Sequence, residues 1–259
     1  MNKKYIFLDL DGTLIDHESN DIPKSTEEAI EKAQAEGHEL FICTGRIPAL
    51  FKGIEKRLNI HNYIAANGKL VVLHDNIIRN EFMNEDYVDE FVQYIYQKKI
   101  DVAFETPEAY VLNSHFSSIT DKFLDTFHLG ITKVQKDYHK KHKVYQMNLM
   151  YIGDYSDLED KFPYFHFSQA NEFGLDVVQG NGMKEQGVRA VVDQLKINLE
   201  DTIAFGDGYN DISMIEYVHT GVAMGNANDA LKEKADFVTD DVTNDGIFNA
   251  FVKLGLIKK

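Results

Sequence analysis

The chain has 259 residues, 44% of them hydrophobic, and its 27 Lys and Arg against 42 Asp and Glu give a formal net charge of −15. This acidic balance argues against nucleic acid or an anionic membrane as a partner, and no apolar run approaches the roughly 20 residues of a membrane-spanning helix. Cys43 is the single cysteine, so no internal disulfide is possible, and we expect a cytoplasmic protein in which Cys43 packs as a small buried hydrophobe.

Short apolar runs alternate with amphipathic helical stretches through residue 68 and again after about residue 186. The runs that we expect to be strands are 5–10, 39–45, 63–68, 202–208, 220–225 and 237–241. Most are apolar on both faces, as parallel strands covered by helices must be. Between the first two strands, Ser25 and Glu28 have the spacing of a capping box, and Gly37 stands where a helix C-terminal cap belongs. The alternation predicts an α/β fold with a doubly wound parallel sheet.

The stretch from about residue 82 to 182 follows a different pattern. In order, it contains a helical stretch at 86–99, strand-like segments at 102–106 and 109–114, a second helix near 117–127 and an alternating run at 144–152. Strands that follow one another without crossover helices indicate an antiparallel sheet with helices on one face. We therefore predict a core domain of residues 1–81 and 183–259, with an α+β domain inserted at 82–182 through short hinges near 80–84 and 180–183.

Polar side chains collect where the predicted parallel strands end. They are Asp9 and Asp11 after the first strand, Thr44 after the second, Asn67 after the third, and Asp207, Asn210 and Asp211 after the run at 202–208. Ligands bind beyond the carboxyl ends of strands in open parallel sheets, so we expect these side chains to face one crevice. Two carboxylates about 5 Å apart repel by about 3 kcal/mol at an effective dielectric near 20, so the cluster requires a counter-charge. Oxygen ligands without histidine or cysteine favour Mg²⁺, which is the cofactor that we expect.

Four short motifs carry a family resemblance: DLDGTL at 9–14, ICTGR at 42–46, MKEQG at 183–187 and GDGYND at 206–211. In this order they resemble the motifs of the haloacid dehalogenase (HAD) superfamily. The insert between the second and third motifs resembles that of the Cof-type subfamily IIB phosphatases, which carry a large α/β cap. The resemblance covers essentially the whole chain. It implies a Rossmann-like HAD core, an inserted α+β cap and a Mg²⁺-dependent phosphatase acting on small phosphorylated metabolites, sugar phosphates first.

The resemblance also implies which residues carry the chemistry. Asp9 would be the nucleophile that takes the phosphoryl group as an aspartyl phosphate, and Asp11 the general acid and base. Thr44 and the Gly45 N–H would hold the phosphate. Lys184 would neutralise its charge.

The metal site and its supporting residues are implied in the same way. The metal ligands would be Asp9, the backbone carbonyl of Asp11, and Asp207. Asn210 would touch the phosphate or the surroundings of the metal. Asp211 would support Lys184 or a metal-bound water.

Each motif taken alone also has a structural interpretation. DGT is common in turns, Thr44 could cap the next helix, and GDGYND could be a turn followed by a helix cap. Arg46 and Asn67 could as easily be structural as substrate-contacting. Glu185 departs from the family pattern, because many relatives carry a small residue after the lysine. In combination and in this order, however, the motifs favour a catalytic site.

Two other functions remain open at this point. A sugar phosphomutase would use the same aspartyl phosphate but return the group to another hydroxyl of the sugar. A non-enzymatic phospho-acceptor would be phosphorylated on Asp9 and read by a partner, although Asp11 and Lys184 argue against it. A dehalogenase is disfavoured, because carbon–halogen cleavage needs no Mg²⁺ and relatives that perform it lack the second aspartate.

Overall fold

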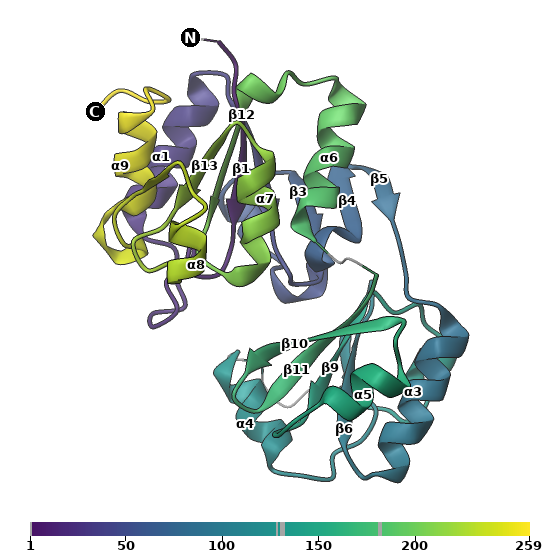
Figure 1. Cartoon of the computed structure of the whole chain (residues 1–259). Coiled ribbons are helices and arrows are strands. Elements are labelled where there is room, and N and C mark those ends of the chain that lie inside the picture. The colour runs from purple at the N-terminus through teal and green to yellow at the C-terminus, as the bar shows by residue number, and fades with distance from the viewer. Residues whose placement is uncertain (1, 128, 130–132, 181–182) are drawn as a thin grey trace. The chain divides into compact units, whose positions relative to one another are not determined.

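The computed structural model describes residues 2–127, 129, 133–180 and 183–259 (Figure 1). Its contacts divide the chain into two compact units, which are described separately below. Unit 1 comprises Met1–Arg46, Phe51–Asn80 and Met183–Lys259, and unit 2 comprises Ile47–Leu50 and Glu81–Gly182. Residues 181 and 182, within the second predicted hinge, lie outside the described residues.

Unit 1 is built on an eight-stranded sheet with the order β14-β13-β12-β1-β2-β3-β4-β5. Its strands are β1 (Tyr5–Asp9), β2 (Glu39–Cys43), β3 (Asn62–Ala65), β4 (Leu70–Leu73), β5 (Asn76–Asn80), β12 (Thr202–Gly206), β13 (Thr220–Ala223) and β14 (Phe237–Val238). Its helices are α1 (Lys24–Ala35), α2 (Ile54–Arg57), α6 (Lys184–Leu195), α7 (Ile212–Tyr217), α8 (Asp229–Lys232) and α9 (Gly246–Lys253). The six strands from β14 to β3 pair in parallel and coincide with the six predicted runs. The predicted α/β fold with a doubly wound parallel sheet is confirmed.

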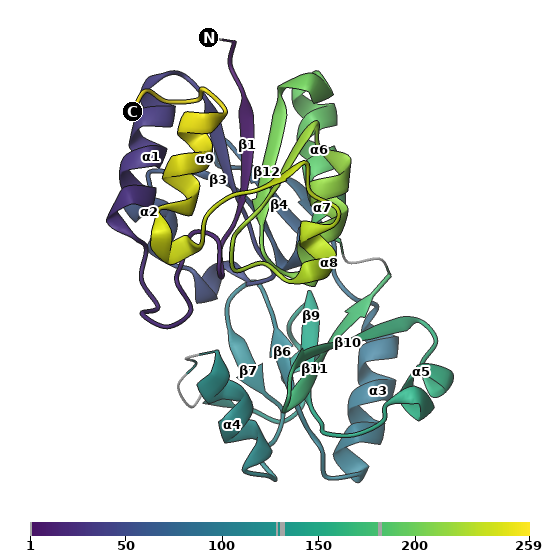
Figure 2. The ribbon, with the colours of Figure 1, turned by 60° about the vertical axis from the view of Figure 1, so that its left-hand side comes forward.

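Helices cover both faces of this sheet. Figure 2 shows α1 and α9 together on one face, with α6 and α7 on the other. On the α6 side, Phe7 of β1 stacks on Phe41 of β2 at 4.8 Å between ring centroids, and both rings belong to the same buried cluster as Val188. On the α9 side, Phe205 of β12 contacts Phe251 at 5.4 Å. Burial of each phenylalanine contributes roughly 1.5 to 3 kcal/mol to the packing of helices on the sheet. This packing holds in place the strands whose ends carry the polar residues.

The position of β1 explains where the polar residues gather. β1 pairs with β12 on one side and with β2 on the other, so the strand order runs outward from it in both directions. This is the switch point of the doubly wound sheet, where the connections leave in opposite directions and open a crevice at the carboxyl ends. Asp9, the last residue of β1, is in register with Cys43, the last residue of β2. The carboxyl ends of β1, β2 and β12 therefore lie side by side.

Helix α1 ends as predicted but begins differently. Gly37 adopts φ 89°, and its N–H donates to the carbonyl of Gln34 at 3.0 Å, which caps the helix. At the other end α1 begins at Lys24 with Pro23 as its N-cap, so Ser25 lies inside the first turn. The Ser25 hydroxyl is buried and has no hydrogen-bond partner among the described residues. The predicted capping box is wrong, and Pro23 could not have completed one, because it lacks the N–H that the box requires.

An antiparallel hairpin, β4–β5, extends the sheet beyond the predicted strands. His74 and Asp75 join its strands with φ of 48° and 63°. Two consecutive left-handed residues form the tight turn that suits the twist of a hairpin. Residues 74 and 75 are not the Asn-Gly or Asp-Gly pair that usually signals such a turn, so the sequence pattern did not predict the hairpin.

Unit 2 contains a six-stranded sheet with the order β10-β11-β9-β6-β7-β8. Its strands are β6 (Asp101–Glu105), β7 (Tyr110–Leu112), β8 (Lys133–Val134), β9 (Gln146–Met150), β10 (Phe165–Asn171) and β11 (Gly174–Gln179). Its helices are α3 (Glu85–Gln97), α4 (Ile119–Thr126) and α5 (Ser156–Lys161). All of its strand pairs are antiparallel except β7 with β8. The two predicted helices and three predicted strands correspond to α3, α4, β6, β7 and β9.

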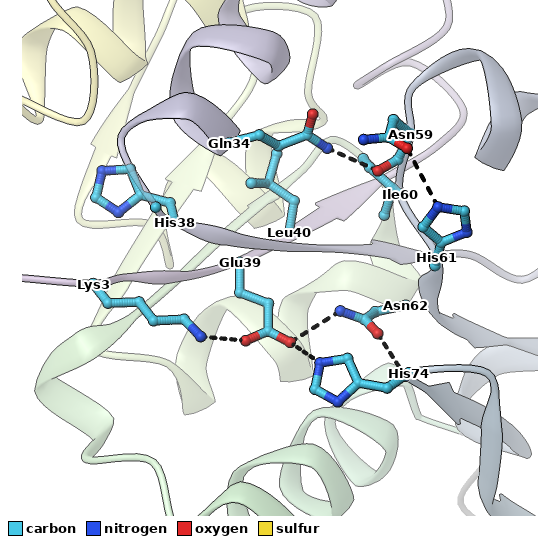
Figure 3. Close-up of a pocket in the computed structure, with 11 residues that line it drawn as sticks. Lys3, Gln34, His38, Glu39, Leu40, Asn59, Ile60, His61, Asn62 and His74 are labelled. Carbon is cyan, nitrogen blue, oxygen red and sulfur yellow. Dashed lines mark hydrogen bonds and ion pairs between the residues drawn. The ribbon is translucent and has the colours of Figure 1, made fainter.

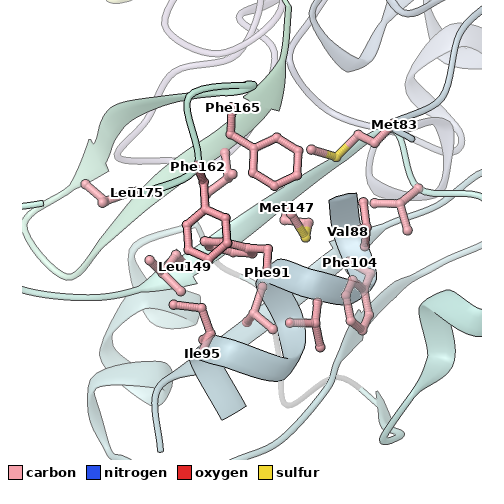
Figure 4. Close-up of a cluster of buried hydrophobic side chains, with 14 of the residues drawn as sticks. Met83, Val88, Phe91, Ile95, Phe104, Met147, Leu149, Phe162, Phe165 and Leu175 are labelled. Carbon is pink, nitrogen blue, oxygen red and sulfur yellow. The ribbon is translucent and has the colours of Figure 1, made fainter. Parts of the chain in front are cut away.

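The core of unit 2 lies between α3 and one face of this sheet. Figure 4 shows Val88, Phe91 and Ile95 of α3 directed at strand side chains such as Phe104 and Met147. Their spacing of three and four residues places them on one face of the helix. Unit 2 thus has a hydrophobic core of its own. None of the helices in the described ranges has the length and apolar character that crossing a bilayer requires.

Candidate active site

Three carboxylates meet at the carboxyl ends of β1 and β12. Asp9 ends β1, Asp207 directly follows β12, and Asp211 ends the short 3₁₀ turn Tyr209–Asp211. One oxygen from each lies within 4.8 Å of the other two, and Asp9 and Asp211 are buried. At this distance and an effective dielectric near 20, each pair repels by about 3 kcal/mol. The sheet therefore concentrates negative charge at the point that the sequence pattern predicted.

Lys184 reaches this cluster because α6 begins close against the sheet. At Gly68, φ is 88° and a Cβ would lie 2.6 Å from the carbonyl oxygen of Met183. At Gly187, on the first turn of α6, a Cβ would lie 2.3 Å from Ile64. Only glycine permits both approaches. They place Lys184, the first residue of α6, directly at the strand ends.

The Lys184 ammonium is fully buried between two of the carboxylates. Its Nζ donates to Oδ1 of Asp211 at 2.6 Å and makes a short contact with Oδ1 of Asp9. Burial lowers the pKa of Lys184, but the negative charges of Asp211 and Asp9 outweigh it and raise the pKa above its usual value. Lys184 is therefore held as a cation inside the site.

Asp211 also holds the turn that carries Asp207. Its second oxygen, Oδ2, accepts the backbone N–H groups of Asp207 at 3.0 Å and Gly208 at 2.9 Å. Gly206 makes room for this arrangement, since a Cβ there would lie 2.6 Å from the Asp211 side chain. With both of its oxygens engaged, Asp211 supports the site, whereas Asp207 is the carboxylate that remains available at its rim.

The pKa values of the other two carboxylates follow from burial and mutual repulsion. Burial, followed by the negative charge of Asp211, raises the pKa of Asp9 well above its ordinary value, while Lys184 opposes the shift. Burial also raises the pKa of Asp207, and nearby His17 opposes that shift. Lys184 therefore opposes these shifts without cancelling them. An additional cation would stabilise the ionised form of both groups.

Asp11 lies in the turn that follows β1, and its carboxylate is not one of the three in the cluster. The turn depends on Gly12, which adopts φ 76°. Any other residue there would place its Cβ 2.2 Å from the Asp207 carboxylate. The Asp11 carboxylate accepts two hydrogen bonds from the guanidinium of Arg46. The structure thus brings the Asp9 and Lys184 side chains together and gives Asp11 a separate partner.

Two of the predicted phosphate-binding residues, Thr44 and Gly45, directly follow β2, and a third, Asn210, lies in the turn after β12. The buried Thr44 hydroxyl accepts the N–H of Arg46 at 3.0 Å. The Asn67 side-chain oxygen accepts from Asn210 Nδ2 at 3.3 Å and lies 3.1 Å from where a Cβ of Gly45 would be. Asn67 has φ of 51° and is buried. It therefore links the loop after β2 to the loop after β12.

Three further residues were missed by the sequence analysis. Asn226 donates to the carbonyl of Gly12 at 2.7 Å, and Asn228 donates to the carbonyl of Asp207 at 3.1 Å. His17 lies 3.8 Å from the Asp207 carboxylate, which raises the pKa of His17. Both asparagines follow the end of a parallel strand, β13, so the rule that found the other polar residues could have found them. Nothing in the local sequence distinguishes His17.

A separate pocket lies at the opposite, amino ends of β2 and β3. It has a volume of about 340 Å³ and is drawn in Figure 3. Its central carboxylate, Glu39, accepts from Lys3 at 2.6 Å and Asn62 at 3.1 Å and lies 2.7 Å from Nε2 of His74. These groups satisfy one another, and ligands of parallel sheets bind at the carboxyl ends instead. We therefore place the candidate active site at the carboxylate cluster.

Comparison with known proteins agrees with this placement. The family model of the haloacid dehalogenase-like hydrolases matches residues 6–251. The chain belongs to this family. Glu185, the departure from the family pattern, accepts from Arg189 on the next turn of α6 and leaves Lys184 in the cluster. The predicted HAD superfamily membership is confirmed.

Several known proteins are similar to the chain over nearly all of its length. YkrA of Bacillus subtilis (strain 168) is 36% identical over 100% of both chains. The pyridoxal phosphate phosphatase YbhA of Escherichia coli (strain K12) is 28% identical over 95% of this chain and 97% of its own. Among solved structures, a protein of Geobacillus kaustophilus HTA426 has a TM-score of 0.93, with 31% identity, 99% coverage of this chain and 100% of its own. The HAD subclass IIB sugar phosphatase BT4131 has a TM-score of 0.86, with 29% identity and coverage of 98% and 100%.

The residues of the cluster fit a hard divalent metal ion. The three clustered groups offer only carboxylate oxygens, the donors preferred by Mg²⁺, Ca²⁺ and Mn²⁺. Because Asp211 is engaged on both oxygens, Asp9 and Asp207 are the side chains that could bind the ion directly. Burial is the main cause of the raised pKa of both groups, with the negative charge of Asp211 adding to it, and a bound cation would oppose both shifts. The carboxylate cluster of Asp9, Asp207 and Asp211 could therefore hold a metal ion.

Proposed function

We propose that the chain is a Mg²⁺-dependent phosphomonoesterase that hydrolyses small phosphorylated metabolites, sugar phosphates first, through an aspartyl phosphate on Asp9. The observation that carries the proposal is the fully buried Lys184 ammonium held between Asp9 and Asp211. A nucleophilic carboxylate can accept a phosphate dianion only where fixed positive charge offsets the repulsion. The names of YbhA and BT4131 as phosphatases support this reaction class.

In the first half-reaction an Asp9 oxygen attacks phosphorus, and the bond from phosphorus to the ester oxygen breaks. Asp11 gives its proton to the departing oxygen, which leaves as an alcohol. In the second half-reaction water attacks phosphorus, Asp11 takes a proton from it, and the bond to Asp9 breaks to release inorganic phosphate. Asp9 and Asp11 then have their starting protonation states.

The remaining site residues bind and orient the phosphoryl group. Lys184 offsets its negative charge, while the Thr44 hydroxyl, the Gly45 N–H and Asn210 donate to its oxygens. Asn67 fixes Asn210 through the hydrogen bond between their side chains. These groups keep phosphorus in line with Asp9, so that binding energy is used for orientation.

The metal would be held by Asp9, Asp207 and the backbone carbonyl of Asp11. When bound, Mg²⁺ supplies positive charge that offsets the carboxylates and the equatorial phosphoryl oxygens. Asp211 keeps the Asp207 turn in place through its two backbone hydrogen bonds. His17 lies 3.8 Å from Asp207 and lowers the pKa of that carboxylate, which favours the ionised form that a metal ion requires.

We also propose that residues 82–182 form an inserted cap domain that selects the substrate, with 1–81 and 183–259 as the catalytic core. The separate hydrophobic core of unit 2 supports an independently folded insert. The free, buried thiol of Cys43 suits a reducing compartment, and we propose that the enzyme acts in the cytoplasm.

Release of inorganic phosphate from p-nitrophenyl phosphate tests the proposal. The purified chain should turn over with Mg²⁺, lose activity in EDTA and regain it when Mg²⁺ is restored. Asp9→Asn should be inactive, whereas Asp229→Asn, an exposed aspartate at the start of α8, should match the parent. Full activity in EDTA, or near-parental turnover by Asp9→Asn, would contradict the mechanism.

The same assay separates the alternatives. Isomerised sugar phosphate without free phosphate would identify a phosphomutase, and labelling of Asp9 without turnover would identify a phospho-acceptor. A screen of sugar phosphates ranked by kcat/KM then identifies the substrate.

A further inference from the structure

The guanidinium of Arg46 makes a two-point contact with the carboxylate of Asp11. Nε donates to Oδ2 at 2.9 Å, and Nη2 makes a short contact with Oδ1. About a quarter of the Arg46 side chain and a third of the Asp11 side chain are exposed, at 24% and 36%. A bidentate pair of this kind fixes the plane of the carboxylate as well as its position.

The backbone of Arg46 is itself fixed. Its N–H donates to the Thr44 hydroxyl, and its carbonyl accepts the N–H of Ala66, both at 3.0 Å. Thr44 is in turn held by Ile64 of β3, which accepts its N–H at 2.8 Å. The guanidinium therefore extends from a rigid point at the carboxyl end of β2.

The Asp11 backbone is also fixed, but its side chain depends on Arg46. Hydrogen bonds from Gly12 N to Ile15 O and from Ile15 N to Leu10 O close the turn around it. The nearby carboxylates at the strand ends repel the Asp11 side chain, and its own negative charge contributes to the raised pKa of Asp9. Among the described hydrogen bonds and ion pairs, those of the Asp11 carboxylate are with Arg46 alone.

We propose that Arg46 is a positioning residue for the proton-transfer step: it holds the Asp11 carboxyl group at the orientation from which it serves the departing oxygen. Each Asp11 oxygen accepts one N–H from Arg46 and keeps a second lone pair, which is the position that carries the transferred proton. The inference rests on the proposed function, in which Asp11 is the general acid and base. A lysine could supply the charge but not the planar two-point contact, so orientation distinguishes the two side chains. The competing role, in which Arg46 binds the phosphate, predicts different kinetics.

Two substrates with the same shape near phosphorus separate these roles. The p-nitrophenolate leaving group departs without a proton, whereas the phenolate of phenyl phosphate is a poorer leaving group that benefits from one. The parameter to compare is kcat/KM with Mg²⁺, because it reports phosphoryl transfer to the enzyme and not the later hydrolysis. The variants are Arg46→Ala, Arg46→Lys, Asp11→Asn and the double variant Arg46→Ala/Asp11→Asn.

A positioning role predicts that Arg46→Ala lowers kcat/KM for phenyl phosphate by at least about tenfold, part of the 10² to 10⁴ that a placed acid supplies. For p-nitrophenyl phosphate the loss should stay within about threefold. Arg46→Lys should recover only part of the lost activity. In the Asp11→Asn background, removal of Arg46 should cost nothing further with phenyl phosphate, because Arg46 acts through Asp11.

Controls separate this effect from misfolding. Arg57→Ala removes an exposed arginine that also pairs with carboxylates, Asp21 and Glu27, and should leave the ratio of the two kcat/KM values unchanged. The midpoint of thermal unfolding of every variant is compared with that of the parent. If Arg46→Ala does not fold, the comparison of the two substrates is made with Arg46→Lys instead.

Three results would overturn the inference. Equal losses of kcat/KM for both substrates, additive with Asp11→Asn, would assign Arg46 to the phosphate. If Arg46→Ala had the same kcat/KM as the parent for both substrates, Arg46 would have neither a positioning nor a phosphate-binding role. If the parent chain released no phosphate, or Asp11→Asn showed no dependence on the leaving group, the proposed function would fail and this inference with it.

Discussion

Replacement of Lys184 by methionine should destabilise unit 1 strongly. The change keeps most of the side-chain volume and removes the buried ammonium, leaving the Asp9, Asp207 and Asp211 carboxylates within 4.8 Å of one another without their internal counter-charge. Because Lys184 is the first residue of the twelve-residue helix α6, the substitution has little effect on helix propensity. The electrostatic loss should therefore dominate.

The structure sets the size of this effect. At 2.6 Å and an effective dielectric near 20, the attraction between the Lys184 ammonium and Asp211 is about 6 kcal/mol. Methionine avoids the cost of desolvating the ammonium, which offsets part of that loss. Removing one partner of a buried ion pair typically costs 3 to 5 kcal/mol. We expect a loss of about 3 to 5 kcal/mol in the free energy of unfolding at pH 7 without divalent metal.

Urea denaturation followed by circular dichroism measures this loss, with unit 1 and unit 2 fitted as separate transitions. Lys24→Met is the matched control, because Lys24 is the exposed first residue of α1, which also has twelve residues. The control should change stability by less than about 0.5 kcal/mol. A loss below about 1 kcal/mol for Lys184→Met would refute the assignment of Lys184 as the internal counter-charge.

Three further predictions concern other parts of the chain. Gly12→Ala should abolish phosphate release from p-nitrophenyl phosphate, because φ is 76° and the new Cβ would lie 2.2 Å from the Asp207 carboxylate; near-parental kcat would contradict this. Burial raises the pKa of Glu105 to about 8, so the folded state keeps its proton while the unfolded chain ionises above about pH 4.5. The stability that protonated Glu105 provides is present below about pH 4.5 and is lost as pH rises to about 8, by at most about 5 kcal/mol. Urea midpoints measured across this range should therefore depend less on pH in Glu105→Gln than in the parent. Asp101→Asn should destabilise unit 2 by about 2 to 4 kcal/mol in urea denaturation, because the buried carboxylate accepts from two hydroxyls and two backbone amides of residues 114–120; an unchanged midpoint would refute this.

The sequence predicted the parallel sheet and its polar edge because both leave a local signal. Apolar runs on both faces indicate covered parallel strands, and carboxylates that end several such runs are expected to meet at one edge of the sheet. This rule predicted that Asp9, Asp207 and Asp211 lie together, and in the structure their carboxylates form one cluster. The placement of Lys184 came from the family motif, since nothing local indicates that a lysine opening a helix is fully buried.

The missed features depend on contacts between segments far apart in the sequence. Arg46 and Asp11 are separated by 35 residues, and their pairing follows from the adjacency of β1 and β2. Asn226 reaches Gly12 across 214 residues. A local pattern also gave the wrong start for α1. The spacing of Ser25 and Glu28 predicted a capping box, but the helix begins at Lys24, directly after Pro23.

The most direct test of the central claim identifies the residue that carries the phosphoryl group. Asp11→Asn keeps the nucleophile but slows the second half-reaction, so incubation with p-nitrophenyl phosphate and Mg²⁺ should trap a covalent intermediate. Intact mass spectrometry should show one added phosphoryl group that hydroxylamine removes, and peptide mapping should place it on Asp9. The account would be contradicted by an adduct at another residue, or by no adduct in a variant that still releases p-nitrophenol.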